Sequence, residues 1–517
     1  SSEDDDDDGD SYSDSTEISC GTNPLNSTDI PLDPDNDGIC NAFDLDDDND
    51  GVLDINDDFP NDPFGFVQLS LGDGFQSGQP QDNATLGGSS GTTCIILSDN
   101  TLRCWGNNDR GQVGDGTRNT QRYTPVEVSV PANKNPVSVS ASGTDGNHIC
   151  ATMDDGSLYC WGYNNYGQLG KGTNCENNNY INGCNGNDGI SSPSQVTLPA
   201  GRTAEAVATG QHHTCAILDD GTVWCWGSND NGQLGGGNSS NSGNWRYSPN
   251  QVMMPSGTSA IAISLGYYHT CAVVDDGRSF CWGSNNHGQL GDGTYTTRNV
   301  PTQVSGTNQY ISISLGQIHS CAITVQKTLQ CWGDNNFQQL GINSGSDRMT
   351  PVDSLLPVGS QVSSVASGYY HTCAILTTME IYCWGYDDDN RLNTEYLCNN
   401  DVTNGCYGDH RGTPALSQLP IGRNAIGAYL GVDYSCVFVD NGGLYCFGSN
   451  SYGQIGNGTT QGYGPNYVGM PVGISPQTND RDLDHDGVFN NEDACMEGET
   501  GWTSNNTTDN DGDGCQD

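Results

Sequence analysis

The sequence predicts an all-β fold, a seven-bladed β-propeller, from three observations. Seven pairs of cysteines share a spacing of ten residues, and successive pairs follow at intervals of 50 to 65 residues, the length of a propeller blade. Only 33% of the 517 residues are hydrophobic and 70 are glycine, which suits short strands joined by tight turns. Closing such repeats into a ring protects their sheet edges, so a ring is favoured over an open solenoid.

Each cysteine pair lies in a predicted β-hairpin. In the clearest copy, centring the turn on Asp220 places Cys215 opposite Cys225. Opposed Cα atoms lie about 4.5 to 5.5 Å apart, so these cysteines should form a disulfide, whereas a zinc site usually needs four ligands. The seven predicted hairpin disulfides are Cys94–Cys104, Cys150–Cys160, Cys215–Cys225, Cys271–Cys281, Cys321–Cys331, Cys373–Cys383 and Cys436–Cys446.

The hairpins lie within a longer motif, which is clearest as GYYHTCAVVDDG at 266–277 followed by CWGSNNHGQLG at 281–291. This motif resembles the regulator of chromosome condensation repeat. The resemblance covers roughly residues 84–472 and implies a seven-bladed propeller. The motif weakens at 387–393, and Thr92 and Tyr434 replace its histidine, so distortion is expected there. The Trp-Gly step recurs at Trp105, Trp161, Trp226, Trp282, Trp332 and Trp384, and Phe447 replaces the tryptophan in the last copy.

A histidine stands two residues before the first cysteine in five repeats. A metal would need these imidazoles to converge on one point, whereas one histidine per repeat spreads them around a ring. The resemblance also implies a structural role for this position, which is the role we expect. The five residues are His148, His213, His269, His319 and His371.

The charge distribution divides the chain. Its 64 acidic and 16 basic residues give a net charge of −48, which argues against a nucleic-acid partner. Residues 1–62 carry −22 and residues 476–517 carry −11. We therefore predict an acidic tail at 1–19, a calcium-binding module at 20–62, the propeller at 63–475 and a second calcium-binding module at 476–517.

Four segments in the acidic ends have the spacing of calcium loops: DPDNDG at 33–38, DDDNDG at 46–51, DLDHDG at 482–487 and DNDGDG at 509–514. Alternate carboxylates converge on Ca²⁺, and a glycine permits the sharp turn. The segments resemble thrombospondin type 3 repeats; the alternative is a solvated acidic linker without bound ions. The predicted ligands are Asp33, Asp35, Asp37, Asp44, Asp46, Asp48, Asp50, Asp54, Asp57, Asp482, Asp484, Asp486, Asp493, Asp509, Asp511, Asp513 and Asp517.

The remaining cysteines suggest further local closures. Cys20–Cys40 and Cys495–Cys515 would clamp the acidic modules. Cys175–Cys184 and Cys398–Cys406 would close two Asn-rich insertions, which serve either as contact sites or as simple decoration. Segment 238–247, which contains Trp245, is another candidate contact. Glycosylation sequons occur at Asn26, Asn83, Asn238, Asn457, Asn505 and Asn506.

These features favour an extracellular, non-enzymatic protein. The nuclear members of the resembled family exchange nucleotide on a small GTPase, but 22 cysteines at hairpin spacing indicate an oxidising compartment. No apolar run approaches the roughly 18 residues of a membrane helix. No Ser/His/Asp grouping or phosphate-binding glycine loop stands out from the repeats.

We expect a structural or adhesive protein that associates head to tail through its calcium-binding ends into a homo-oligomer, a filament or a surface layer. The loop that starts at Asp509 lacks a ligand at position 12, which either a water or a carboxylate from the acidic N-terminal segment of a neighbouring molecule would supply. The alternative is a monomeric propeller that binds a protein or glycan, as the resembling β-lactamase-inhibitor propeller binds a protein. Residues 467–472 are the candidate strand that completes the first blade.

Overall fold

The computed structural model describes residues 91–460 except 98–99, 142–146, 174–188, 238–244, 388–389, 395–409, 420–422 and 441–442. The predicted calcium loops, the two insertions and the closing strand at 467–472 lie outside the described residues. So do the cysteine pairs Cys20–Cys40, Cys175–Cys184, Cys398–Cys406 and Cys495–Cys515.

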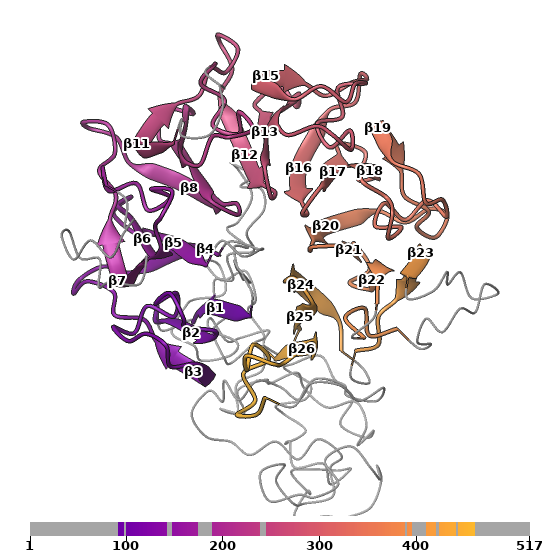
Figure 1. The fold of residues 1–517 in the computed structure, drawn as a ribbon. Coiled ribbons are helices and arrows are strands. Elements are labelled where there is room, and N and C mark those ends of the chain that lie inside the picture. Colours follow the sequence, from indigo (N-terminus) through magenta and orange to yellow (C-terminus); the bar gives the residue numbers. More distant parts are fainter. Residues whose placement is uncertain are drawn as a thin grey trace, which may run out of the picture. The chain divides into compact units, whose positions relative to one another are not determined.

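The described residues form seven antiparallel sheets, which confirms the predicted all-β, seven-bladed propeller (Figure 1). Blades 1 and 7 contain three described strands each: β1 (Thr92–Ile96), β2 (Leu102–Gly106), β3 (Arg122–Glu127), then β24 (Ala425–Leu430), β25 (Tyr434–Val439) and β26 (Leu444–Gly448). Blades 2 and 3 contain β4 (Pro136–Ala141), β5 (His148–Met153), β6 (Leu158–Tyr163), β7 (Gly189–Gln195), β8 (Ala204–Thr209), β9 (His213–Leu218), β10 (Val223–Gly227) and β11 (Arg246–Gln251). Blades 4 to 6 contain β12 (Ala260–Leu265), β13 (His269–Val274), β14 (Ser279–Gly283), β15 (Arg298–Gln303), β16 (Tyr310–Leu315), β17 (His319–Thr324), β18 (Leu329–Gly333), β19 (Arg348–Asp353), β20 (Val362–Ser367), β21 (His371–Leu376), β22 (Ile381–Tyr386) and β23 (His410–Leu416).

Each four-stranded blade is a meander in which consecutive strands pair. The first strand lies nearest the centre of the ring, where β8, β12, β16 and β20 contact their counterparts in neighbouring blades (Figure 1). The described strands of blade 1 correspond to the second, third and fourth strands of a complete blade, and those of blade 7 to the first three. The described residues contain no helix that could span a membrane.

The seven hairpin disulfides are confirmed. In every hairpin the two cysteines are direct partners in the strand register, as Cys271 and Cys281 are between β13 and β14. Their Cα atoms lie 4.0 to 4.1 Å apart. Each disulfide is fully buried, so it joins the two central strands of its blade inside the core.

A buried tryptophan joins six of the blades to the blade before it, and blade 7 has Phe447 at this position. The indole N–H of Trp282 in blade 4 donates to the carbonyl oxygen of Gln233 in blade 3 at 2.8 Å. The indole of Trp105 in blade 1 donates to the carbonyl oxygen of Gln454 in blade 7 at 2.9 Å. The ring is therefore closed between the last blade and the first by the bond used elsewhere. Gly291 has φ +67°, and a Cβ there would lie 2.7 Å from the indole nitrogen of Trp332, which explains the second glycine of the Gly-Gln-Leu-Gly segment.

The motif histidines form a second set of bonds between blades. His213 in blade 3 lies 2.9 Å from the hydroxyl of Thr270 in blade 4. That hydroxyl donates to the carbonyl oxygen of Gln233, so the imidazole Nε2–H must be the donor to the threonine. The same contact joins His148 to Thr214, His269 to Ser320, His319 to Thr372 and His371 to Ser435. The structural role expected for these histidines thus has a physical basis.

The departures from the motif occur in matched pairs. The hydroxyl of Tyr434 lies 2.8 Å from the hydroxyl of Thr93, so it replaces the histidine contact between blades 7 and 1. Thr92 takes the histidine position in blade 1, and the residue of blade 2 that would receive its bond is the apolar, buried Ile149. The Thr92 hydroxyl instead donates to the carbonyl oxygen of Asn107 in its own blade at 2.7 Å, so a side chain without a polar atom, Ile149, leaves no buried polar group unsatisfied at that junction.

The described residues of the unusual segment in blade 6, Asp387 and residues 390–393, keep the local structure of the other blades, contrary to expectation. The backbone N–H of Leu392 donates to the Asp387 carboxylate at 3.1 Å, the bond that an asparagine side chain accepts in other blades. Asn393 has φ 45° at a position where other blades have glycine. It precedes the blade in which Phe447 replaces tryptophan, so the asparagine and the phenylalanine occur at the same junction.

Candidate binding face

The strand register brings three variable positions of each junction to one end of the blades. Gly227 at the end of β10 pairs with His213 at the start of β9 and with Arg246 at the start of β11. The loop before the second strand and the loop between the third and fourth strands therefore lie on the same face. We define the rim positions of a junction as the residue before the Gly-Gln-Leu-Gly segment of one blade, and the residues after Trp-Gly and before the fourth strand of the next.

One aromatic cluster occupies the rim between blades 2 and 3. The rings of Tyr166 and His212 stack with centroids 4.3 Å apart, and the Trp245 ring meets Tyr166 edge-on at 4.8 Å. Tyr163 lies 5.7 Å from His212, and the guanidinium of Arg110 lies 5.4 Å from the Tyr163 ring centroid. Segment 238–247 was predicted to be a contact site, which stays a prediction. Within its described part, Trp245 belongs to this cluster.

A second cluster occupies the rim between blades 5 and 6. Phe337 lies at its centre, with ring centroids 4.3 Å from Tyr370, 5.1 Å from Tyr386 and 5.2 Å from His410. The guanidinium of Arg391 lies 4.8 Å from the Tyr386 ring centroid. Cations over aromatic faces add to the stability of such clusters.

Tyrosines of the inner loops lie between these clusters. Tyr267 meets Tyr268 at 4.3 Å and Tyr369 at 6.5 Å, and Tyr369 meets Tyr370 at 4.3 Å. Burial raises the pKa of Tyr268 and of Tyr370, so both phenols stay protonated and can donate hydrogen bonds. The rings around these contacts are half-buried, neither enclosed in the core nor fully exposed.

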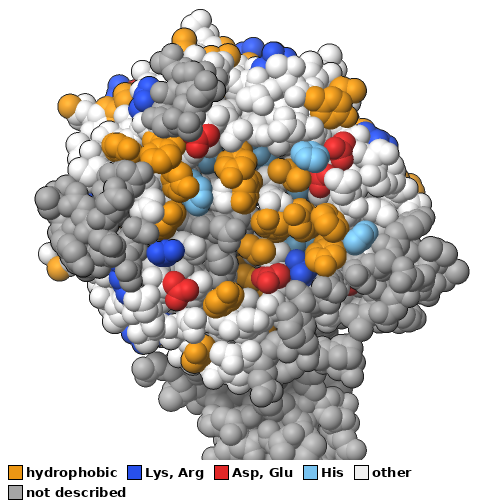
Figure 2. All heavy atoms as spheres, viewed as in Figure 1, with side chains coloured by type: hydrophobic (Ala, Val, Ile, Leu, Met, Phe, Trp, Pro, Cys, Tyr) orange, Lys and Arg blue, Asp and Glu red, His pale blue; other side chains and the backbone are white. Residues whose placement is uncertain are grey.

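Figure 2 shows hydrophobic side chains gathered around the centre of one face, with histidine and acidic side chains among them. The described histidines that are not fully buried, His212, His287 and His410, belong to the rim or the inner loops. The face therefore combines apolar rings with a few polar groups, the composition of a protein-binding surface core.

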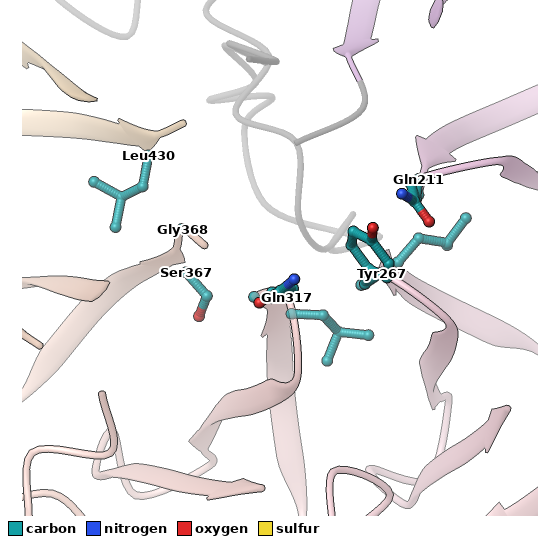
Figure 3. A pocket seen from close by; sticks show the side chains of 11 residues that line it. Gln211, Tyr267, Gln317, Ser367, Gly368 and Leu430 are labelled. Atoms are coloured by element: carbon teal, nitrogen blue, oxygen red, sulfur yellow. The ribbon is translucent and has the colours of Figure 1, made fainter. Parts of the chain in front are cut away.

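The hollow at the centre of this face is small. Its lining includes Gln211, Tyr267, Gln317, Ser367 and Leu430, which come from five different blades (Figure 3). Its volume is about 30 Å³, room for about one water, whereas sites for small organic ligands usually have several hundred Å³. The hollow among these residues is thus a shallow depression in the face, too small for an organic ligand.

The rim between blades 4 and 5 differs from the aromatic clusters. His287, Asp334 and Asp347 occupy its three positions, and their ligand atoms lie within 4.8 Å of one another. Burial, together with the nearby Asp347 carboxylate, raises the pKa of Asp334.

None of these clusters was predicted from the sequence. Their signal was present, because aligning the repeats places tyrosine or phenylalanine at Tyr163, Tyr166, Phe337 and Tyr386, next to motif residues that recur. Of the predicted sequons, Asn457 lies in the described residues, where its side-chain oxygen accepts the backbone N–H of Thr459 at 3.1 Å. The other five lie outside them.

Comparisons with known proteins agree with the fold. Two proteins of Arabidopsis thaliana are similar: the ultraviolet-B receptor UVR8, 26% identical over 366 residues that cover 70% of this chain and 76% of the receptor, and the mitochondrial RCC1 domain-containing protein RUG3, 35% identical over 170 residues that cover 32% and 35%. Yeast RCC1 (Prp20) bound to Kap60 has a similar structure, with a TM-score of 0.60 and 21% identity over 72% of this chain and 84% of the yeast chain. Residues 428–454 match the regulator of chromosome condensation (RCC1) repeat, and residues 66–395 match the RCC1-like domain. The chain belongs to the RCC1-like domain family.

Proposed function

We propose that this protein binds another protein through the aromatic face of its propeller and is not an enzyme. The observation that carries the proposal is the run of half-buried rings from Tyr267 to His410, together with the cluster around Tyr166. Tyrosine, tryptophan and arginine dominate the energetics of protein interfaces. Similar structures support this class of function, since yeast RCC1 is seen bound to Kap60 and has been studied for binding to Gsp1p and histones.

The scaffold is suited to binding without rearrangement. Seven buried disulfides and the hydrogen bonds between blades fix the backbone beneath the rim. The rings also hold one another in place, so few rotamers remain to be lost when a partner arrives. The aromatic face is therefore pre-organised.

A photo-crosslinking experiment tests this proposal. A benzophenone amino acid replaces Tyr166 or Phe337 in the full chain, and matched controls carry it at Val325 and Met379. Both controls are exposed and lie at hairpin turns, the opposite end of the blades from the rim. We expect the two rim probes to crosslink the same partner in the native extracellular medium while the controls do not. Equal labelling from both faces would contradict the proposal.

We propose that the protein is secreted or displayed at the cell surface. The seven hairpin disulfides support this proposal, because such bonds persist in oxidising compartments and are rare in reducing ones. Thiol alkylation of the native protein followed by mass spectrometry should find these cysteines unlabelled. Labelled hairpin cysteines in freshly isolated material would overturn it.

A second candidate function is calcium-dependent self-association through the acidic ends. The supporting observation is the alternation of aspartates with glycine at 33–38, 46–51, 482–487 and 509–514. Ca²⁺ bound there would neutralise segments that carry −22 and −11. Electron microscopy with Ca²⁺ and then with a chelator separates the alternatives: ordered polymers only with Ca²⁺ support self-association, and single discs in both conditions support a monomeric binding propeller.

A further inference from the structure

The rim between blades 4 and 5 brings one imidazole and two carboxylates together. His287 comes from the loop after β14, Asp334 directly follows β18, and Asp347 directly precedes β19. The Nδ1 atom of His287 lies 3.3 Å from Oδ1 of Asp334 and 3.0 Å from Oδ2 of Asp347. The aromatic binding face does not explain this group.

The scaffold imposes this closeness. The same rim positions place Arg110 over Tyr163 at one junction and Phe337 beside Tyr386 at another. The backbone therefore directs these side chains toward each other whatever their chemistry. What distinguishes the junction between blades 4 and 5 is that the positions carry metal-ligating groups.

Neighbouring donors orient both carboxylates. Gln339 Nε2 donates to Oδ2 of Asp334 at 2.6 Å, and Asn336 Nδ2 donates to its Oδ1 at 2.5 Å. The backbone N–H of Asn335 donates to Oδ1 of Asp347 at 3.1 Å. Consequently Oδ2 of Asp347 is left to face the imidazole, and Oδ1 of Asp334 faces it as well. Metal sites commonly have ligands held by such supporting bonds.

The cluster has more negative charge than its protein surroundings balance. The Asp334 side chain is only 1% exposed, and among the described residues His287 is the basic group that lies within ion-pair distance of either carboxylate. The imidazole Nδ1 can present a single proton to two acceptors. A divalent cation in its place would attract both carboxylates and the nitrogen lone pair at once.

We propose that His287, Asp334 and Asp347 bind one borderline divalent transition-metal ion, of the class of Zn²⁺ and Co²⁺. One imidazole nitrogen with two carboxylate oxygens suits these ions, whereas Ca²⁺ prefers oxygen ligands alone. Two donors that each lie about 2.1 Å from a shared ion are about 3.0 to 3.4 Å apart. The two distances from the His287 nitrogen to the carboxylate oxygens, 3.0 and 3.3 Å, fall in this range, and the three ligand atoms lie within 4.8 Å of one another.

The ion would connect two blades. His287 belongs to blade 4 and both aspartates to blade 5, so binding adds a crosslink that exists in the folded state alone. His287 is 36% exposed and Asp347 is 25% exposed on their side chains, so water completes the coordination on the solvent side.

Calorimetric and absorption titrations with Co²⁺ test the site. The full chain is used without a polyhistidine tag and with excess Ca²⁺, so that the acidic loops contribute the same background to every sample. The variants are H287Q and D347N, which change partly exposed side chains, and H410Q is the control because it removes a rim histidine that lies among aromatic rings. Melting temperatures in chelator verify that all three fold.

We expect H287Q and D347N each to lose one Co²⁺ per chain, with affinity at that site at least 100-fold weaker, while H410Q matches the wild type. Zn²⁺ should raise the melting temperature of the wild type and of H410Q more than that of the two site variants. The same Co²⁺ stoichiometry and affinity in the wild type, H287Q and D347N would overturn the proposal. An equal Zn²⁺-induced rise in melting temperature in all four proteins would also overturn it.

Discussion

The buried contacts between blades differ in kind from the contacts at the rim. We call the motif histidines, Tyr434, their hydroxyl partners and the buried tryptophans the hub. At the hub, a histidine or Tyr434 reaches a hydroxyl of the next blade at six junctions within the described residues. At the rim, equivalent positions hold an arginine over tyrosine, stacked aromatic rings, or a histidine with two aspartates. The same backbone arrangement thus holds one repeated hydrogen bond at the hub and different side-chain contacts at the rim.

The difference follows from burial. A buried polar atom without a partner costs about 1 to 3 kcal/mol, so a change at one hub position requires a matching change across the junction, as Thr92 and Ile149 illustrate. The aromatic side chains of the rim are half-exposed, and water can satisfy their polar atoms. The rim can therefore vary one residue at a time, which suits a surface that selects a partner.

Removing a hub tryptophan should have the largest effect on stability. Trp282→Ala deletes a fully buried side chain and the bond to the Gln233 carbonyl, so we expect a loss of about 3 to 5 kcal/mol in the free energy of unfolding. Trp282→Phe should cost about 1 to 2 kcal/mol, because Thr270 still donates to that carbonyl. Urea denaturation measures both. An unfolding midpoint for Trp282→Ala equal to that of the wild type would contradict the role assigned to the hub.

Removing one hairpin disulfide should rank next. Replacing Cys271 and Cys281 together with alanine releases a crosslink of ten-residue separation and should destabilise the fold by about 3 kcal/mol. The same replacement of Cys321 and Cys331 serves as a matched comparison in the next blade. Urea midpoints that fall by similar amounts in both variants would show that each disulfide stabilises its own blade to the same extent. Unchanged midpoints would contradict the stabilising role assigned to the disulfides.

Mild acid should weaken the hub selectively. Burial lowers the pKa of His269 and of His319 to about 3, against an ordinary value of 6.5. The unfolded chain therefore takes up protons below pH 6.5 while the folded hub does not, so stability is complete above pH 6.5 and declines as pH falls toward 3. Each histidine should contribute on the order of 1 kcal/mol per pH unit in that range. Melting temperatures measured from pH 7 to pH 4 test this, and His269→Gln should flatten the profile relative to the wild type.

Changes at the rim should affect stability least and binding most. Tyr166→Ala removes a half-buried ring, so we expect less than about 1 kcal/mol of destabilisation. Its affinity for the crosslinked partner should fall at least tenfold, since stacked aromatic anchors dominate such contacts. Met379→Gln on the opposite face is the control. A large fall in melting temperature with unchanged binding would reverse the distinction between hub and rim.

The repeated part of the fold could be predicted from sequence because its signals are local. A cysteine pair ten residues apart in a two-stranded hairpin already specifies its partner, and all seven described bridges agree. The histidine contacts were harder, since His213 and Thr270 are 57 residues apart and meet only when two blades pack. Their structural role was foreseen, but their partners were not.

The rim chemistry could not be predicted from one repeat at a time. Phe337 and His410 come from different blades and are 73 residues apart in the chain. His287 likewise stands in a different loop and a different blade from Asp334 and Asp347, which lie at the two ends of the loop between β18 and β19. The aspartate loops predicted at the chain ends, by contrast, have a contiguous spacing. Prediction succeeded for the hairpin disulfides, whose pattern is contiguous, and failed for the rim, where the ring itself brings residues together. The aspartate loops stay a prediction.

The buried bridge at the base of each hairpin turn also affects how the protein survives damage. The turn at 275–278 is exposed at Asp275 and Asp276 and would be accessible to a protease, but the bond between Cys271 and Cys281 spans it. A cut there leaves both fragments covalently attached and still paired along β13 and β14. A single nick at such a tip would therefore go unnoticed on a non-reducing gel, and the nicked blade would keep its strands paired.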